Sequence, residues 1–180
     1  MSLPFRIESE RLTIRPWEPA DRPALKRFVN DADMMRYISF GRVWDDAHID
    51  ALLARQAGFL EQYGCCVGAV VLKETDQVVG VGGIQPQDKS RLYEFAWWIW
   101  KDYWNRGFAT EIAQAMVRHA FGVMRLPQVV AIADVPNLAS IRVMEKIGMR
   151  YEGRRNAHDL AERHPNVEVV FYLLDNPSPG

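Results

Sequence analysis

A glycine and an arginine stand where an apolar strand gives way to a helix. Residues 93–100 have the composition of a buried strand, Arg106 and Gly107 follow in a short loop, and a helical pattern begins at Ala109. The first N–H groups of a helix have no intrahelical acceptor, and the helix dipole favours an anion beside them. Arg106 adds a side-chain cation. These residues predict a binding site for an anionic phosphoryl ligand at the loop.

The strand and the helix beside this loop belong to a βαβ pattern. Residues 109–125 carry a continuous apolar stripe at helical spacing, and residues 129–135 are a nearly all-apolar run typical of a strand buried on both faces. Two strands joined through a helix pair in parallel with a right-handed crossover. A second helix is expected over residues 138–147, closed by Gly148. The pattern therefore predicts a parallel pair of strands formed by residues 93–100 and 129–135.

Shorter patterns surround this unit. Residues 46–62 predict a helix that Asp45 or Asp46 caps and Gly64 ends. Alternating and apolar runs predict a hairpin and further strands, and polar or proline-containing segments predict two helix starts. These elements are the strand 11–15, the helix starts 18–21 and 31–38, the hairpin 65–72 and 78–84, and the last strands 150–155 and 167–174 around a polar loop at 156–166. No linker or repeat interrupts them, so we expect one domain over residues 1–180.

Composition limits the possible partners. The net charge of −1 gives no overall field that favours nucleic acid or a membrane surface. No apolar run approaches the ~18 residues of a transmembrane helix, and no secretory signal opens the chain. Cys65 and Cys66 are adjacent and the four histidines have no metal-ligand spacing, so no metal site is expected. Buried thiols suit a reducing compartment, which predicts a cytoplasmic protein.

Residues 104–111 read WNRGFATE, and within residues 137–149 the segment NLAS is followed by EKIGM. The first segment resembles the acetyl-CoA loop of one family, the GCN5-related N-acetyltransferases (GNAT), and the second resembles the next motif of that family. The opening ERLTIRPW at residues 10–17 and MRYI at residues 35–38 resemble the branch that includes the ribosomal-protein N-terminal acetyltransferases of the RimJ/RimL type. The resemblance extends over residues 8–174, nearly the whole chain.

The resemblance implies an α/β fold, with a mixed and mostly antiparallel sheet that splays between two central parallel strands and carries helices on both faces. The pantetheine of acetyl-CoA would lie in that splay against the strand 93–100, and its pyrophosphate on the amides of residues 105–110. Gly107 would let the backbone approach the phosphates. Asn105 stands where many relatives have glycine. The residues implied in cofactor binding are Trp98, Ile99, Trp100, Asn105, Arg106, Gly107, Phe108, Ala109, Thr110, Asn137 and Ser140.

The implied reaction is direct acetyl transfer from the thioester to a neutral primary amine. Backbone N–H groups near Trp98 and Ile99 are the expected donors to the developing oxyanion. Ser140 is the candidate that protonates the leaving thiolate, because Met144 stands where many relatives have tyrosine. The alternative for Ser140 is an ordinary hydroxyl in a first helical turn, and Asn137 is a candidate N-cap as well as a pantetheine ligand.

Two carboxylates are candidates for the base that takes up the proton of the amine. Glu94 lies inside an otherwise apolar strand, where a charge is costly unless it is used. Its alternative is a strand-end carboxylate in solvent. Asp159, in the polar loop before the last strand, is the rival candidate.

The acceptor is not encoded in any motif. A protein N-terminal α-amine, with a reference pKa of about 8, needs less help to lose its proton than a lysine at about 10.4. A small amine such as a polyamine or an antibiotic is the alternative acceptor, and a non-catalytic acyl-CoA-binding module is the alternative of another class. The protein is expected to be a monomer or a homodimer.

Overall fold

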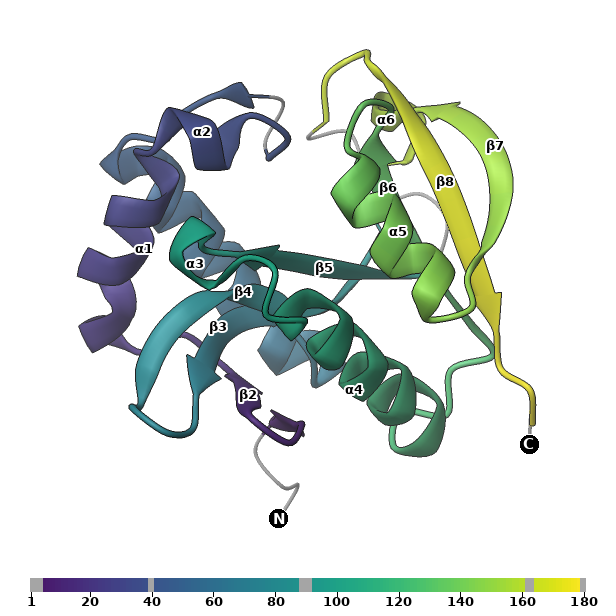
Figure 1. Cartoon of the computed structure of the whole chain (residues 1–180), viewed down its shortest axis with the longest axis horizontal. Helices are drawn as coiled ribbons and strands as arrows, with labels where there is room; N and C mark the ends of the chain where they lie inside the picture. The colour runs from purple at the N-terminus through teal and green to yellow at the C-terminus, as the bar shows by residue number, and fades with distance from the viewer. Residues whose placement is uncertain (1–4, 39–40, 88–91, 161–163, 179–180) are drawn as a thin grey trace.

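The computed structural model describes residues 5–38, 41–87, 92–160 and 164–178, and within them eight strands form one sheet (Figure 1). The strand order is β1-β2-β3-β4-β5-β6-β8-β7. The strands are β1 (Ile7–Glu8), β2 (Leu12–Arg15), β3 (Val67–Leu72), β4 (Gln77–Pro86), β5 (Tyr93–Ile99), β6 (Gln128–Asp134), β7 (Arg150–Asn156) and β8 (Glu168–Asp175).

The parallel pair lies at the centre of this sheet, as the βαβ pattern predicts. β5 and β6 are parallel, and every other neighbouring pair is antiparallel. β5 and β6 keep register only at Tyr93 with Val129 and at Glu94 with Val130. Beyond Glu94 the two strands turn away from one another (Figure 1). The splayed, mostly antiparallel sheet of the GNAT fold is therefore confirmed.

Helices cover both faces of the sheet. α4 (Phe108–Gly122) and α5 (Leu138–Lys146) pack on one face, where Phe95, Trp97 and Ile99 of β5 also point. The opposite face is covered by α1 (Arg22–Val29), α2 (Ala32–Met35), α3 (Asp46–Tyr63) and, beside β6 and β8, α6 (Ala157–Leu160). Short 3-10 turns are also formed by Pro19–Asp21 and Lys101–Tyr103. Trp98 and Trp100 belong to this second face, opposite Trp97, as strand alternation predicts.

The ends of α3 show why this helix forms where the sequence places it. The Asp45 side chain accepts a hydrogen bond from the His48 N–H, and Gly64 adopts the left-handed conformation (φ 70°) that closes the last turn.

Some of the bounds predicted from the sequence differ from those in the structure. α4 begins at Phe108 and ends at Gly122, β3 begins at Val67, and β1 and α6 were not expected at all. The sequence also predicts a turn over residues 86–90, between β4 and β5, and most of this segment lies outside the described residues.

None of the helices in the described part of the chain combines the length and the apolar character needed to span a membrane.

Candidate active site

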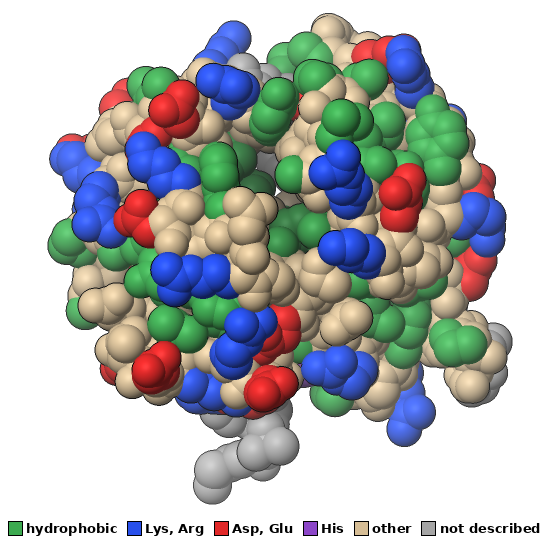
Figure 2. All heavy atoms as spheres, in the orientation of Figure 1, with side chains coloured by type: hydrophobic (Ala, Val, Ile, Leu, Met, Phe, Trp, Pro, Cys, Tyr) green, Lys and Arg blue, Asp and Glu red, His purple; other side chains and the backbone are tan. Residues whose placement is uncertain are grey.

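A cavity of about 580 Å³ opens where β5 and β6 separate. It reaches from the splayed strands to α3 on one side and to the start of α5 on the other. The space-filling view shows the surface hollowed over β5, between α2 and α5 (Figure 2). Among the residues predicted from sequence, the cavity is lined by Glu94, Trp98, Asn137 and Ser140. The fold therefore brings together one candidate base, one candidate acid and the splayed edge of β5.

The hydrogen bonding of β5 decides which of its backbone groups face the splay. At one end of the β4–β5 ladder Gln87 N–H donates to Leu92 O, and at the other end Trp100 N–H donates to Val79 O. Between these points the antiparallel register is continuous. Even-numbered residues of β5 therefore bond to β4, and odd-numbered residues point to the opposite edge. Beyond Glu94 that edge has no strand beside it, so it can pair with an extended ligand.

The hydrogen-bonding pattern of β5 corrects two of the predicted cofactor-binding residues, Trp98 and Trp100. The N–H groups of Trp98 and Trp100 belong to the β4 side of the strand, so they are not directed into the splay. The Trp100 ring is buried and stacks on Phe28 at 5.8 Å, on the face away from α4. Among the predicted backbone ligands of β5, only Ile99 lies on the open edge, together with Trp97, whose backbone was not predicted. The Ile99 carbonyl already accepts the Trp104 indole N–H at 2.7 Å.

The loop after β5 ends in an uncapped helix N-terminus. Gly107 is the N-cap of α4 with φ 78°, and no side chain accepts from the first turn of the helix. Asn105 also adopts a left-handed conformation (φ 61°), which asparagine tolerates better than most residues. That tolerance accounts for Asn105 at a position where many relatives have glycine. Arg106 is exposed, and its guanidinium lies 5.1 Å from the centre of the Tyr103 ring. The loop thus presents free N–H groups and a cation to solvent.

A clamp from the N-terminal segment holds this loop in place. The Arg11 guanidinium donates to Glu111 Oε2 at 2.7 Å and to Arg106 O at 3.0 Å, and it lies 4.6 Å from the centre of the Phe108 ring. Ser9 Oγ donates to Glu111 Oε1 at 2.7 Å. Burial opposes the ionisation of Glu111, but the hydrogen bonds from Arg11 and Ser9 outweigh it and lower the pKa. Arg11 therefore neutralises a carboxylate beside the loop and holds the Arg106 carbonyl.

Replacing Arg11 by alanine should weaken acetyl-CoA binding by between about 3-fold and 30-fold, the cost of one or two charge-assisted hydrogen bonds near solvent. Titration calorimetry with CoA would measure this, and Arg6→Ala, which breaks an exposed ion pair with Glu8 on the same segment, is the control. A lower Tm of the Arg11→Ala variant with unchanged CoA affinity would show that Arg11 stabilises the fold and does not contribute to CoA binding.

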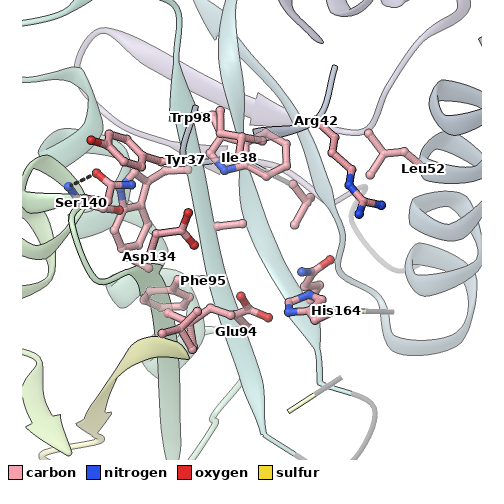
Figure 3. A pocket seen from close by; sticks show the side chains of 18 of the residues that line it. Tyr37, Ile38, Arg42, Leu52, Glu94, Phe95, Trp98, Asp134, Ser140 and His164 are labelled. Atoms are coloured by element: carbon pink, nitrogen blue, oxygen red, sulfur yellow. Dashed lines mark hydrogen bonds between the residues drawn. The ribbon is translucent and has the colours of Figure 1, made fainter. Parts of the chain in front are cut away.

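The start of α5 supplies Asn137 and Ser140. Asn137 is the N-cap, and its Oδ1 accepts the Ser140 N–H at 3.2 Å. Both side chains line the cavity, and Figure 3 shows Ser140 at its margin. Met144, one turn later, is fully buried in the core and has no proton to give. Ser140 thus lies in the first turn of α5, as its structural alternative foresees, and its side chain also lines the cavity, as its candidate role as an acid requires.

The two candidate bases have different surroundings. Glu94 is only 6% exposed and lines the cavity at the point where β5 and β6 part. Its alternative, a solvated strand-end carboxylate, does not hold. Asp159 is exposed on α6 and is not among the residues that line the cavity. The structure therefore brings Glu94 to the site and leaves Asp159 outside it.

A second carboxylate in the cavity was missed from sequence. Asp134 ends β6, lines the cavity and is directed into it, as Glu94 is, from the neighbouring strand (Figure 3). Burial raises its pKa. A polar residue that closes an otherwise apolar central strand was the signal available. Glu94 of β5 pairs with Val130 of β6, and side chains alternate along β6. Ile132 and Asp134 therefore lie on the same face of the sheet as Glu94.

Because burial disfavours the ionised form, Asp134 costs stability at neutral pH, and the cost disappears as pH falls below the ordinary pKa of 3.8. Asp134→Asn should therefore raise Tm at pH 7 by on the order of 1–2 °C. The gain should vanish near pH 3. Differential scanning calorimetry at both pH values tests this, and a variant that is less stable at pH 7 would contradict it.

Comparisons by family model, by sequence and by structure all match this chain to acetyltransferases. The model of the acetyltransferase (GNAT) domain matches residues 11–150. YnaD of Bacillus subtilis, an uncharacterized N-acetyltransferase, is 32% identical over 83% of this chain and 85% of its own length. YdaF of the same organism, named provisionally as a ribosomal N-acetyltransferase, is 27% identical over 92% of each chain. A crystal structure of a GNAT-family acetyltransferase from Bacillus anthracis has 29% identity and a TM-score of 0.78, and the match covers 97% of this chain and 100% of that one.

Proposed function

This chain belongs to the GNAT acetyltransferase family, so it is an acetyl-CoA-dependent N-acetyltransferase, and we propose that its acceptor is the α-amine of a peptide or protein N-terminus. The observation that carries the proposal is the cavity between the open edge of β5 and α3, whose wall on the α3 side bears Arg42 and Arg55. Glu94 and Asp134 in the same lining suit one ammonium group, whereas the further charges of a polycation would meet Arg42 and Arg55. A peptide terminus brings a single ammonium group.

The donor half of the site follows from backbone geometry. The open edge of β5 offers the N–H and carbonyl of Trp97 and the N–H of Ile99 to pantetheine, and the uncapped start of α4 offers its N–H groups to pyrophosphate. Gly107 has no Cβ in the path of the phosphates. The Asn137 amide faces the same cavity from α5.

Proton movement is assigned to two side chains. Glu94, buried where the strands part, accepts a proton from the acceptor ammonium, directly or through water, so that a neutral amine attacks the thioester. The N–H groups of the β5 edge stabilise the oxyanion that forms on the acetyl carbonyl. Ser140 passes its proton to the thiolate that leaves and takes up the proton that the attacking nitrogen loses as the tetrahedral intermediate collapses. An α-amine, with a reference pKa of about 8, needs only modest assistance from Glu94 at neutral pH.

A small free amine is the second candidate acceptor. The volume of about 580 Å³ falls within the range of small-molecule sites. The branch that contains ribosomal-protein N-terminal acetyltransferases is favoured by the relative YdaF, and the protein-terminus acceptor is therefore placed first.

An acetylation screen tests the proposal. Peptides with different N-terminal residues, the same peptides with blocked termini, and free amines are incubated with acetyl-CoA and analysed by mass spectrometry. Acetylation confined to peptides with a free α-amine is expected. Preferential acetylation of polyamines would overturn the acceptor assignment. Stabilisation by acetyl-CoA in a thermal shift without turnover on any amine would favour a binding module instead.

A further inference from the structure

The charged residues that line the cavity are separated by sign. The carboxylates, Glu94 and Asp134, both come from the splayed sheet. Arg42 and Arg55, with His48 between them in the chain, come from α3 and the segment that precedes it. Figure 3 shows Arg42 on the side of α3, across the cavity from Asp134. The cavity is therefore acidic on the wall where acetyl would be delivered and basic on the opposite wall.

Two of these charges lack a protein partner. Arg42 is exposed and Asp134 is half-buried, and neither side chain makes a hydrogen bond or ion pair within the part of the chain that the structure describes. Nearby cations on the outer surface behave differently, since Arg22 pairs with Asp50 and Lys26 pairs with Asp46 at 2.8 Å. A charge that faces a partly enclosed cavity gains most when the ligand brings the opposite charge.

Apolar side chains occupy the space between the two walls. Trp44 and Trp98 meet edge to face, with ring centres 6.4 Å apart, and Leu52 and Ile38 lie beside them in the lining. Trp44, Leu52 and Ile38 are buried, so an apolar surface lies between the two charged walls. A ligand that meets both walls would carry its two charges on an organic skeleton that packs against this apolar surface.

We propose that the acceptor is a primary amine that also carries an anionic group, with its ammonium toward Asp134 and Glu94 and its anion toward Arg42. The inference rests on the proposed acetyltransferase function and specifies its substrate class. A free amino acid and a peptide with an acidic residue beside its N-terminus both have this chemistry. The cavity lining also includes Arg55, His164 and Tyr37. The His48 ring is already engaged, because its Nδ1 lies 2.6 Å from Asp45 Oδ1.

Matched acceptors test the inference. Three tripeptide amides that differ only in the second residue, Ser-Asp-Ala, Ser-Asn-Ala and Ser-Lys-Ala, are compared with free glutamate, glutamine amide and spermidine. The acidic peptide or glutamate should have a kcat/KM at least about 10-fold above its neutral analogue, the equivalent of one charge-assisted contact. Which of the two is preferred distinguishes a peptide acceptor from a free amino acid. Equal rates for acidic and neutral probes, or a preference for the lysine peptide, would overturn the inference alone. A preference for spermidine would overturn both the inference and the proposed peptide acceptor.

Charge reversal at the basic wall sharpens the test. Arg42→Glu should remove the preference for the acidic probe and favour the lysine peptide, with KM rather than kcat carrying the change. Arg36→Glu is the matched control, because Arg36 is exposed, pairs with Asp33 and does not line the cavity. An unchanged preference in Arg42→Glu would exclude Arg42 as the anion ligand. Absence of acetylation of every probe by a protein that binds acetyl-CoA would instead overturn the proposed function itself.

Discussion

Glu94→Gln is expected to lower kcat/KM for amine acetylation by about 100-fold or more, the usual contribution of a positioned general base. The side chain is buried at the point where β5 and β6 separate and lines the cavity that admits the amine. Glutamine keeps the shape but cannot accept the proton. The loss should be largest at low pH, where more of the acceptor is protonated, and should shrink as pH approaches the pKa of the amine.

Asp159→Asn is the matched control, because its carboxylate is exposed on α6 and lies outside the cavity lining. Its kcat/KM should stay within about 2-fold of the unmodified protein, in keeping with a surface substitution. Initial rates of CoA release across pH 6 to 9 measure both variants. The reverse pattern, a silent Glu94→Gln and an inactive Asp159→Asn, would move the base to α6.

Gly107→Ala is expected to raise the Kd for acetyl-CoA by about 10-fold or more. Gly107 has φ 78°, a left-handed conformation that costs an L-residue roughly 1–2 kcal/mol. A Cβ built there meets only Arg11 Nη2, at 3.7 Å, so the protein itself leaves room for it. The added methyl group therefore acts on the backbone conformation and on the approach of pyrophosphate, while the core stays intact.

Gly58→Ala is the control for this substitution. Gly58 lies within α3, and a Cβ built there meets nothing within 4 Å. Alanine at that position should leave CoA binding unchanged and raise stability by about 0.5–1 kcal/mol. Calorimetric titration with CoA and thermal unfolding measure the two effects separately. Unchanged CoA affinity in Gly107→Ala would place the pyrophosphate elsewhere.

Local signals account for the parts of the fold that could be predicted. Asp45 and Gly64 mark the ends of α3, and the apolar runs around α4 define the parallel pair at the centre of the sheet. The anion-binding loop combines a glycine, a cation and a helix start within a few residues, so its geometry depends on short-range interactions. The capping of α5 by Asn137 could be predicted as well, because its Oδ1 bonds to the N–H of Ser140, only three residues away.

The features that could not be predicted depend on contacts between distant segments. Whether Trp98 or Ile99 faces the splay is decided by the register of β5 on β4, which alternation within β5 alone does not reveal. The Arg11–Glu111 clamp joins residues 100 apart in the chain. Asp134 reaches the cavity because β6 diverges from β5, whereas Asp159 is carried away from it on a short helix that the sequence pattern did not indicate.

The most direct test of acetyl transfer at this site follows both products in one reaction. The protein is incubated with acetyl-CoA and the tripeptide Ser-Asp-Ala amide, and CoA release and peptide mass are measured together, with Glu94→Gln in parallel. One acetyl group on the peptide α-amine for each CoA released, at a rate at least about 100-fold lower in Glu94→Gln, is predicted. CoA release without amine acetylation, or equal rates in the two proteins, would contradict transfer at the splay of β5 and β6.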